Sequence, residues 1–266
     1  MRPITTILGA VAAVCLVAGA ASAEVKTKEI EYKAGDTTLQ GFLAWDDALT
    51  KTGKVPGVLV IHEWWGHNQH ARNQAKRLAQ AGYVGFALDM YGKGKIATHP
   101  KDAQAFVAEA TKDPKVVQQR FQAAIDLLKK DPHVDPAHIA AIGYCFGGGV
   151  ALQMARMGAD LDAVASFHGS LAPQGPPAEK GKVKARILVM TGADDPMVPA
   201  AVVDAFKKEM TAAGAKFEVI SYPGAKHSFT NPDADKAGVP GLGYSPEADK
   251  ASWDALLKFF KETWKK

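Results

Sequence analysis

Ile139-Ala140-Ala141-Ile142-Gly143-Tyr144-Cys145-Phe146-Gly147 is the stretch around which the rest of the chain is organised. A short apolar run leads into it, and the residues that follow are typical of a helix, so the pattern predicts a strand, a sharp turn and a helix. The glycines at 143 and 147 let the backbone pack closely on both sides of Cys145. We therefore expect a nucleophile elbow whose thiol lies at a helix N-terminus, where the helix dipole favours a thiolate.

Two later segments supply the partners that such a nucleophile needs. Glycines after a strand also occur in phosphate-binding turns, so Cys145 alone does not decide between the two interpretations. Asp195 follows the apolar run 186–190, and His227 follows the run 217–222. Nucleophile, acid and histidine in this order are typical of α/β-hydrolases. Because the carboxyl ends of parallel strands meet at one edge of a sheet, we expect Cys145, Asp195 and His227 to form a catalytic triad.

Apolar runs and amphipathic stretches alternate along the chain. A length of 266 residues with 47% hydrophobic and 23% charged residues suits a single soluble domain, here 24–266. The alternation predicts an α/β fold of the α/β-hydrolase type, with a mostly parallel twisted sheet and helices on both faces. Strands are expected at 25–33, 39–45, 55–62, 83–88, 139–142, 161–167, 186–190 and 217–222, and helices at 68–80, 101–112, 116–130, 199–213 and 247–264.

The first 23 residues have the pattern of a secretory signal peptide. Arg2 gives a positive start, residues 7–21 are apolar, and Ala21-Ser22-Ala23 supplies a small-residue cleavage site. The apolar run is shorter than the roughly 20 residues that span a membrane, so we expect a periplasmic or secreted protein with no stable membrane insertion after cleavage. Cleavage also removes Cys15 and leaves Cys145 without an intramolecular disulfide partner.

The predicted triad indicates thiol-dependent acyl chemistry. His227 would take the thiol proton and later return it to a leaving alcohol, while Asp195 would hold the ring and stabilise its charged form. The negative charge that develops on the substrate oxygen needs backbone N–H donors. The residue after the nucleophile, Phe146, supplies one, and Trp64 after the strand at 55–62 supplies the other.

These motifs resemble those of the dienelactone hydrolase family, α/β-hydrolases with a cysteine nucleophile. The resemblance implies Cys145 as nucleophile, His227 as base and Asp195, rather than the adjacent Asp194, as the acid. It also implies that Glu63 contacts the resting thiol and helps to convert it into a thiolate. The matching segments are His62-Glu63-Trp64-Trp65-Gly66, Asp89-Met90-Tyr91, Gly143-Tyr144-Cys145-Phe146-Gly147-Gly148, Gly192-Ala193-Asp194-Asp195 with Val198-Pro199, and His227-Ser228-Phe229.

The sequence departs from the family at two positions that bind substrate. Members that act on dienelactone are similar in holding the substrate carboxylate with arginines, and the matching positions here are Lys93 and Asn231. Lysine lacks bidentate geometry and asparagine lacks the charge, so a small dianionic lactone is an unfavourable substrate. We expect a small-molecule ester or lactone, with Trp65, Tyr91, Lys93 and Asn231 binding it and the aromatic residues favouring an apolar group.

Other classes of site receive little support. His62, His67 and His70 do not have the H-E-x-x-H spacing, and Gly66 interrupts any helix that would align them, so we expect no metal. No cofactor is implied. The net charge of +4 is spread along the chain, which argues against a nucleic-acid partner, and the sequence does not determine the oligomeric state. His168 ends another strand and is expected to be a hydrogen-bonded structural residue.

Two other functions are compatible with the same fold. A non-catalytic ligand-binding scaffold is one, because fold alone does not guarantee chemistry, although the ordered triad argues against it. An acyltransferase that uses the Cys145 thiol is the other, since the acyl group could pass to an acceptor other than water. Burst kinetics would separate catalysis from binding, and product analysis with added alcohol or amine would separate hydrolysis from transfer.

Overall fold

The computed structural model of the chain describes residues 24–265, so the predicted signal peptide at 1–23 lies outside the described residues. Eight strands form one sheet in the order β1-β2-β4-β3-β5-β6-β7-β8. β2 is antiparallel to both of its neighbours, β1 and β4. The remaining strands, β4, β3, β5, β6, β7 and β8 in their order across the sheet, are parallel to one another. The strands are β1 (Val25–Ala34), β2 (Thr37–Asp46), β3 (Val55–Ile61), β4 (Val84–Leu88), β5 (Val134–Tyr144), β6 (Ala163–Phe167), β7 (Arg186–Gly192) and β8 (Phe217–Tyr222).

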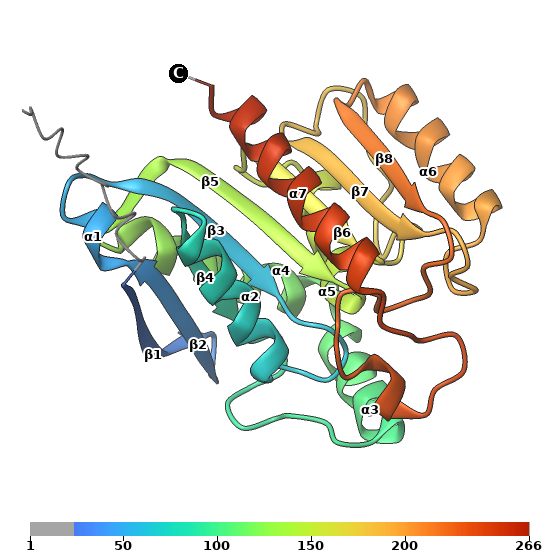
Figure 1. The fold of residues 1–266 in the computed structure, drawn as a ribbon, viewed down its shortest axis with the longest axis horizontal. Helices are drawn as coiled ribbons and strands as arrows, with labels where there is room; N and C mark the ends of the chain where they lie inside the picture. Colours follow the sequence, from blue (N-terminus) through green and yellow to red (C-terminus); the bar gives the residue numbers. More distant parts are fainter. Residues whose placement is uncertain (1–23, 266) are drawn as a thin grey trace, which may run out of the picture.

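Helices cover both faces of the sheet, as the alternating pattern predicts. Figure 1 shows α2 and α7 in front of the sheet and α4 and α5 behind it. The helices are α1 (Asp47–Thr50), α2 (Gln69–Gln80), α3 (Pro100–Thr111), α4 (Pro114–Lys130), α5 (Phe146–Arg156), α6 (Ala200–Ala213) and α7 (Pro246–Thr263), with a short 3₁₀ helix η1 (Ala234–Ala237). None of the helices within residues 24–265 has the length and hydropathy of a membrane span.

The core is divided by the sheet into two layers. Successive side chains of a strand point to opposite faces, so Leu59 packs with α4 and α5 while Val58 and Val60 pack with α2 and α7. The parallel strands β4 and β6 are buried along their whole length. This continuous burial explains why they read in the sequence as unbroken apolar runs rather than as alternating patterns.

Local signals in the sequence place the helix ends well. Asn68 caps α2 by accepting a hydrogen bond from the Ala71 N–H, and Gly214 ends α6 in the left-handed conformation. Proline occupies the first position of α4, two residues before the predicted start. The alternation of apolar runs and amphipathic stretches thus predicted most of these strands and helices, with shifts of one or two residues at most of their ends.

The topology brings chemically useful residues to one edge. The arrows of β3, β5 and β7 point toward the same edge of the sheet in Figure 1. The loops that leave this edge begin after Ile61, Leu88, Tyr144, Phe167, Gly192 and Tyr222. In open parallel sheets such loops form the ligand site, so this edge is where a catalytic site is expected.

Candidate active site

Cys145 occupies the tight turn between β5 and α5. Its backbone has φ +51° and ψ −114°, a region that non-glycine residues rarely adopt and that stores strain at functional sites. A Cβ atom at Gly143 would lie 2.1 Å from the Gly147 carbonyl oxygen, and one at Gly147 would lie 2.3 Å from the Ile61 carbonyl oxygen. Both positions therefore require glycine, and the strand, turn and helix of the predicted elbow are present.

His227 and Asp195 lie together in the loops after β8 and β7. The His227 Nδ1 is 2.8 Å from Asp195 Oδ2, and the other carboxylate oxygen of Asp195 accepts a hydrogen bond from the Met197 N–H at 2.8 Å. Both side chains are buried, whereas the neighbouring Asp194 is exposed. Of the two adjacent carboxylates, Asp195 is the one in contact with the histidine.

The second ring nitrogen of His227 faces the thiol. Nε2 has no hydrogen-bond partner of ordinary geometry among the described residues. Burial acts to lower the pKa of His227, but the negative charge of Cys145 and the hydrogen bond to Asp195 outweigh it and raise the pKa to about 10. The thiol of Cys145 and the His227 ring are therefore neighbours, the arrangement in which a histidine can act as the base for a thiol nucleophile.

The predicted oxyanion donors are the backbone N–H groups of Phe146, at the start of α5, and Trp64, in the turn after β3. Phe146 is the first residue of α5, so its N–H has no partner inside the helix. Trp64 lies in the turn after β3, and its carbonyl oxygen accepts a hydrogen bond from the Tyr91 hydroxyl at 3.0 Å. The Tyr91 ring also packs against Phe146, with ring centroids 5.6 Å apart. Tyr91 therefore ties together the two segments that carry the predicted donors.

The environment of Tyr91 shows how close it lies to the nucleophile. Burial, followed by the negative charges of Cys145 and Asp89, raises the pKa of Tyr91 far above its ordinary value. The hydroxyl thus remains a neutral donor, and it is occupied by the Trp64 carbonyl. The hydroxyl orients the loop after β3, and the ring is buried against neighbouring rings, so the substrate contact of Tyr91 stays a prediction.

Glu63 is buried and bound by two uncharged donors. The Ser228 hydroxyl donates to Oε1 at 2.7 Å, and the Asn231 amide donates to Oε2 at 2.6 Å. Within the described residues Glu63 makes no hydrogen bond to Cys145, so the contact with the resting thiol that the resemblance implies is not observed. Both oxygens are instead directed toward the loop that carries His227, because that loop supplies the two donors.

Two of the predicted substrate-binding residues have other partners. Lys93 is exposed and pairs with Glu31 on the edge strand β1, so its placement does not support a role in holding substrate. Asn231 is buried, donates to Glu63 and accepts from the Asp233 N–H at 3.0 Å. Its amide nitrogen holds Glu63. The arginine charge that the family resemblance implies at this position is therefore not needed for the contact that Asn231 makes.

A cavity of about 310 Å³ lies beside this network. Trp65 forms one wall, and Asn231 forms another. Lys236 is the one lysine or arginine among the described lining residues, and it pairs with Asp233 at 2.6 Å. The cavity shares two of the predicted substrate-binding residues, Trp65 and Asn231, and provides room for a small organic group.

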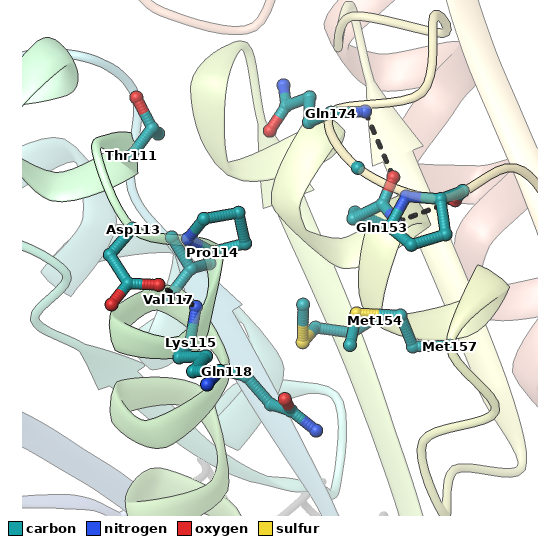
Figure 2. Close-up of a pocket in the computed structure, with 12 residues that line it drawn as sticks. Thr111, Asp113, Pro114, Lys115, Val117, Gln118, Gln153, Met154, Met157 and Gln174 are labelled. Atoms are coloured by element: carbon teal, nitrogen blue, oxygen red, sulfur yellow. Dashed lines mark hydrogen bonds between the residues drawn. The ribbon is translucent and has the colours of Figure 1, made fainter.

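A second cavity, of about 430 Å³, lies between α4 and α5. Figure 2 shows Met154 on α5 and Met157, the residue after this helix, across from Lys115 and Gln118 on α4. None of the predicted catalytic residues lines it. Its polar Gln153 side chain is already used, because it accepts from the Gln174 N–H and donates to the Pro176 carbonyl.

His62, in the first loop, has structural partners on both ring nitrogens. His62 Nε2 accepts a hydrogen bond from the Met90 N–H at 3.1 Å, and Nδ1 lies 2.5 Å from the Glu63 carbonyl oxygen, to which it must donate. Both ring nitrogens are therefore used to connect the loops after β3 and β4. No group of three potential metal ligands occurs in the part of the chain that the structure describes.

Three neighbours of the triad were not singled out as site residues from the sequence. Besides Cys145, the non-glycine residues with positive φ in the described chain are His168 and Ser228, and both contact the site. Thr230 lies within hydrogen-bond distance of His168. The hydrogen bonds of His168 agree with the structural role predicted for it, and Ser228 lies in the motif that follows His227, but the sequence does not mark the positive φ values or the side-chain partners of these residues, which appear only when the loops are assembled.

Comparison with known proteins places the fold. The model of the dienelactone hydrolase family matches residues 40–264. A dienelactone hydrolase-like promiscuous phosphotriesterase from metagenomic libraries is 36% identical, with a TM-score of 0.85 over 90% of this chain and 98% of that one. A protein of Aquifex aeolicus with the provisional name carboxymethylenebutenolidase is 28% identical over 87% of this chain and 96% of its own. An uncharacterized protein of Caenorhabditis elegans is 41% identical over 56% of this chain and 94% of its own. The predicted α/β-hydrolase fold is confirmed.

Proposed function

Because the chain belongs to the dienelactone hydrolase family, we propose that this hydrolase cleaves carboxylic esters or lactones through an acyl-enzyme at Cys145 and acts after export. Membership supports hydrolysis of a small molecule. The observation that carries the finer proposal is the geometry of the three residues: Cys145 occupies the strained turn before α5, and the buried His227 ring contacts Asp195 at 2.8 Å. The resting state that we propose is a thiolate and imidazolium pair, which is an activated nucleophile at neutral pH.

In the acylation half of the reaction, the Cys145 sulfur attacks the ester carbonyl carbon. A C–S bond forms, and the carbonyl electron pair moves to oxygen, where the Phe146 and Trp64 N–H groups receive the charge. The tetrahedral intermediate then collapses as its C–O bond to the alcohol breaks. His227 gives its Nε2 proton to the leaving oxygen, and the acyl group stays on sulfur.

In the deacylation half, His227 is neutral and acts as the base. Its Nε2 takes a proton from water while the water oxygen attacks the thioester carbon. The C–S bond breaks, the carboxylic acid leaves, and the thiolate and imidazolium pair is restored. Asp195 keeps the proton on Nδ1 through its 2.8 Å contact, so Nε2 always faces the reacting atoms.

Glu63 supports this cycle by holding the histidine loop. Its carboxylate binds Ser228, the residue after His227, and also binds Asn231 farther along the same loop. The role that we assign to Glu63 is therefore to fix the position of His227. A buried carboxylate with neutral partners also leaves its negative charge uncompensated, which affects the choice of substrate.

The charges around the site favour an uncharged substrate. Glu63 and Asp195 are both buried, and the His227 ring already pairs with Asp195 and Cys145. Lys236, at the adjacent cavity, pairs with Asp233. A carboxylate on the substrate would meet net negative charge in a site of low polarity, where like charges repel strongly. Neutral esters or lactones with a group that fits beside Trp65 are the substrate class that we propose.

Uncharged phosphotriesters are a second candidate class. The solved relative that is 36% identical carries the description of a promiscuous phosphotriesterase. A phosphotriester has no net charge, so it meets the same electrostatic requirement as a neutral ester. The same thiolate would attack phosphorus in place of carbon, and the same two N–H donors would face the phosphoryl oxygen.

The test uses the chain from residue 24 and matched substrates. The panel contains 4-nitrophenyl pentanoate, the anionic mono-4-nitrophenyl succinate, small lactones and a 4-nitrophenyl dialkyl phosphate, with Cys145→Ala and Cys145→Ser as controls. We expect turnover of the neutral ester, loss of turnover in the folded alanine variant, and a kcat/KM at least roughly tenfold lower for the anionic ester.

Each outcome bears on a separate part of the proposal. Equal activity of wild type and Cys145→Ala would overturn the thiol mechanism, and binding without turnover of any substrate would favour the scaffold alternative. Formation of a new ester when methanol is added, at the expense of acid, would favour acyl transfer. Equal kcat/KM for the two esters would leave the mechanism intact and contradict the charge preference alone.

A further inference from the structure

His168 connects three segments of the proposed catalytic centre. It follows β6, is fully buried, and adopts a φ of +41°. The Cys145 N–H donates to its Nδ1 at 3.2 Å while also donating to the Phe167 carbonyl oxygen at 3.0 Å. Its Nε2 is 2.9 Å from Thr230 Oγ1, and its ring packs edge-on against the His227 ring with centroids 5.2 Å apart.

These contacts define which nitrogen of His168 holds the proton. A backbone N–H can only donate, so Nδ1, which receives the Cys145 N–H, must be the unprotonated nitrogen. The proton is then on Nε2, and Thr230 Oγ1 accepts it. Burial, together with the positive charge of His227, lowers the pKa of His168 well below its ordinary value. The ring is therefore neutral at neutral pH, where His227 is charged.

We propose that His168 is a positioning residue that holds the strained Cys145 turn and the His227 ring, and that Thr230 selects the tautomer in which it can do so. This inference rests on the proposed function of the site. His168 touches the backbone of the nucleophile and the side of the base, and its protonated Nε2 points away from both. It is thus a support for the reacting groups and does not exchange protons with them.

Loss of the Thr230 acceptor would remove the preference for the Nε2–H tautomer. In the other tautomer Nδ1–H would face the Cys145 N–H, and two donors would oppose each other. Relief of that contact requires movement of the Cys145 turn or of the His168 ring, which also contacts His227. The displacement would change the attack geometry of the thiolate, while the cavity beside Trp65 has none of these residues in its lining.

The experiment compares Thr230→Val with Thr230→Ser. Valine keeps the shape and removes the acceptor, so we expect kcat to fall roughly 10- to 100-fold with little change in KM. Serine keeps the hydroxyl, and we expect it to retain most of the activity. The matched control is Thr191→Val, because the Thr191 hydroxyl is buried and has no hydrogen-bond partner in the described structure, so kcat should not change.

A second measurement does not depend on turnover. Nitrogen-15 NMR of the histidine rings should show His168 as a neutral Nε2–H tautomer in the wild-type protein and as a mixture in folded Thr230→Val. Detection of the Nδ1–H tautomer in the wild type would overturn the inference, as would wild-type kcat in Thr230→Val or equal impairment of the serine and valine variants. Absence of ester turnover with the expected NMR pattern would contradict the proposed function and leave the tautomer assignment standing.

Discussion

His227 and His168 lie with their rings 5.2 Å apart, and the protein drives their pKa values in opposite directions. Each follows a strand of the sheet, His168 after β6 and His227 after β8, and each ring is buried. His227 contacts the Asp195 carboxylate and the negative charge of Cys145, which raise its pKa to about 10. His168 contacts a backbone N–H and a hydroxyl, so burial and the charge of His227 lower its pKa.

Charged partners, rather than burial or position in the fold, decide which of two buried histidines is suited to act as a base. Burial lowers the pKa of both rings, but only His227 has anions that outweigh it. We therefore assign the reactive half of the proposed centre to the loop after β8 and the supporting half to the loop after β6.

Removal of the reactive histidine should cause the largest loss. We expect His227→Ala to lower kcat/KM for a neutral 4-nitrophenyl ester by roughly 10⁴- to 10⁶-fold, because base and counter-charge are lost together. The control is His99→Ala, at an exposed histidine far from the triad in the chain. A loss of less than about tenfold would show that His227 is not the base and would break the comparison with His168.

The Asp195 carboxylate contacts His227 and makes its pKa differ from that of His168, so its removal is the next test. Asp195→Asn should lower kcat by about 10⁴-fold, since an amide at this position can turn its NH₂ group toward Nδ1 and stabilise the wrong tautomer. Asp194→Asn makes the same chemical change at the exposed neighbour and should have wild-type kinetics. The reverse ranking of these two variants would move the acid to Asp194.

The sequence predicted the reactive half well because its residues are marked locally. Gly143 and Gly147 flank Cys145 as the strained turn requires, and Asp195 and His227 each follow an apolar run that becomes a strand of the sheet. The order of these residues and the parallel topology were sufficient to bring them to one edge. Helix boundaries followed equally from local signals such as the Asn68 cap.

The supporting half could not be predicted in the same way. The bond from Asn231 to Glu63 joins residues 168 positions apart, and that from His168 to Thr230 joins residues 62 positions apart. Neither pairing leaves a periodic pattern in the sequence. The position of Lys93 after the Asp89-Met90-Tyr91 motif predicts that it binds substrate. In the structure Lys93 lies beside β1 and forms an ion pair with Glu31 of that strand. These outcomes depend on which loops meet, which the order of elements does not determine.

The pH dependence should follow His227 and not His168. A raised pKa keeps His227 charged to higher pH, so proton donation to the leaving alcohol should persist through neutral pH and decline as the pH passes about 10. The hydrogen bond to Asp195 contributes to this rise, so the declining limb of the residual Asp195→Asn activity should lie at lower pH. A declining limb at the same pH in both proteins would contradict the assignment.

The buried carboxylates of Asp195 and Glu63 differ in the same way, because Asp195 contacts His227 whereas Glu63 contacts uncharged donors. A smaller effect is expected when a partner of Glu63 is removed. Glu63 relies on uncharged donors, so Asn231→Ala should leave one of its oxygens without a partner and lower the free energy of unfolding by about 1–3 kcal/mol. Urea unfolding measures this change. The matched variant Asn73→Ala removes an exposed amide paired with Gln69 on α2 and should have little effect. Equal stability of both variants would mean that Asn231 does not hold Glu63.

Intact-mass spectrometry during rapid reaction with a neutral 4-nitrophenyl ester would detect the proposed acyl-enzyme itself. We expect a burst of one equivalent of 4-nitrophenol per protein. We also expect a mass increase equal to the acyl group, located by peptide mapping on Cys145 and absent from Cys145→Ala. Turnover with no acyl adduct in the wild-type protein during the burst, or an adduct on a different residue, would contradict the proposed mechanism.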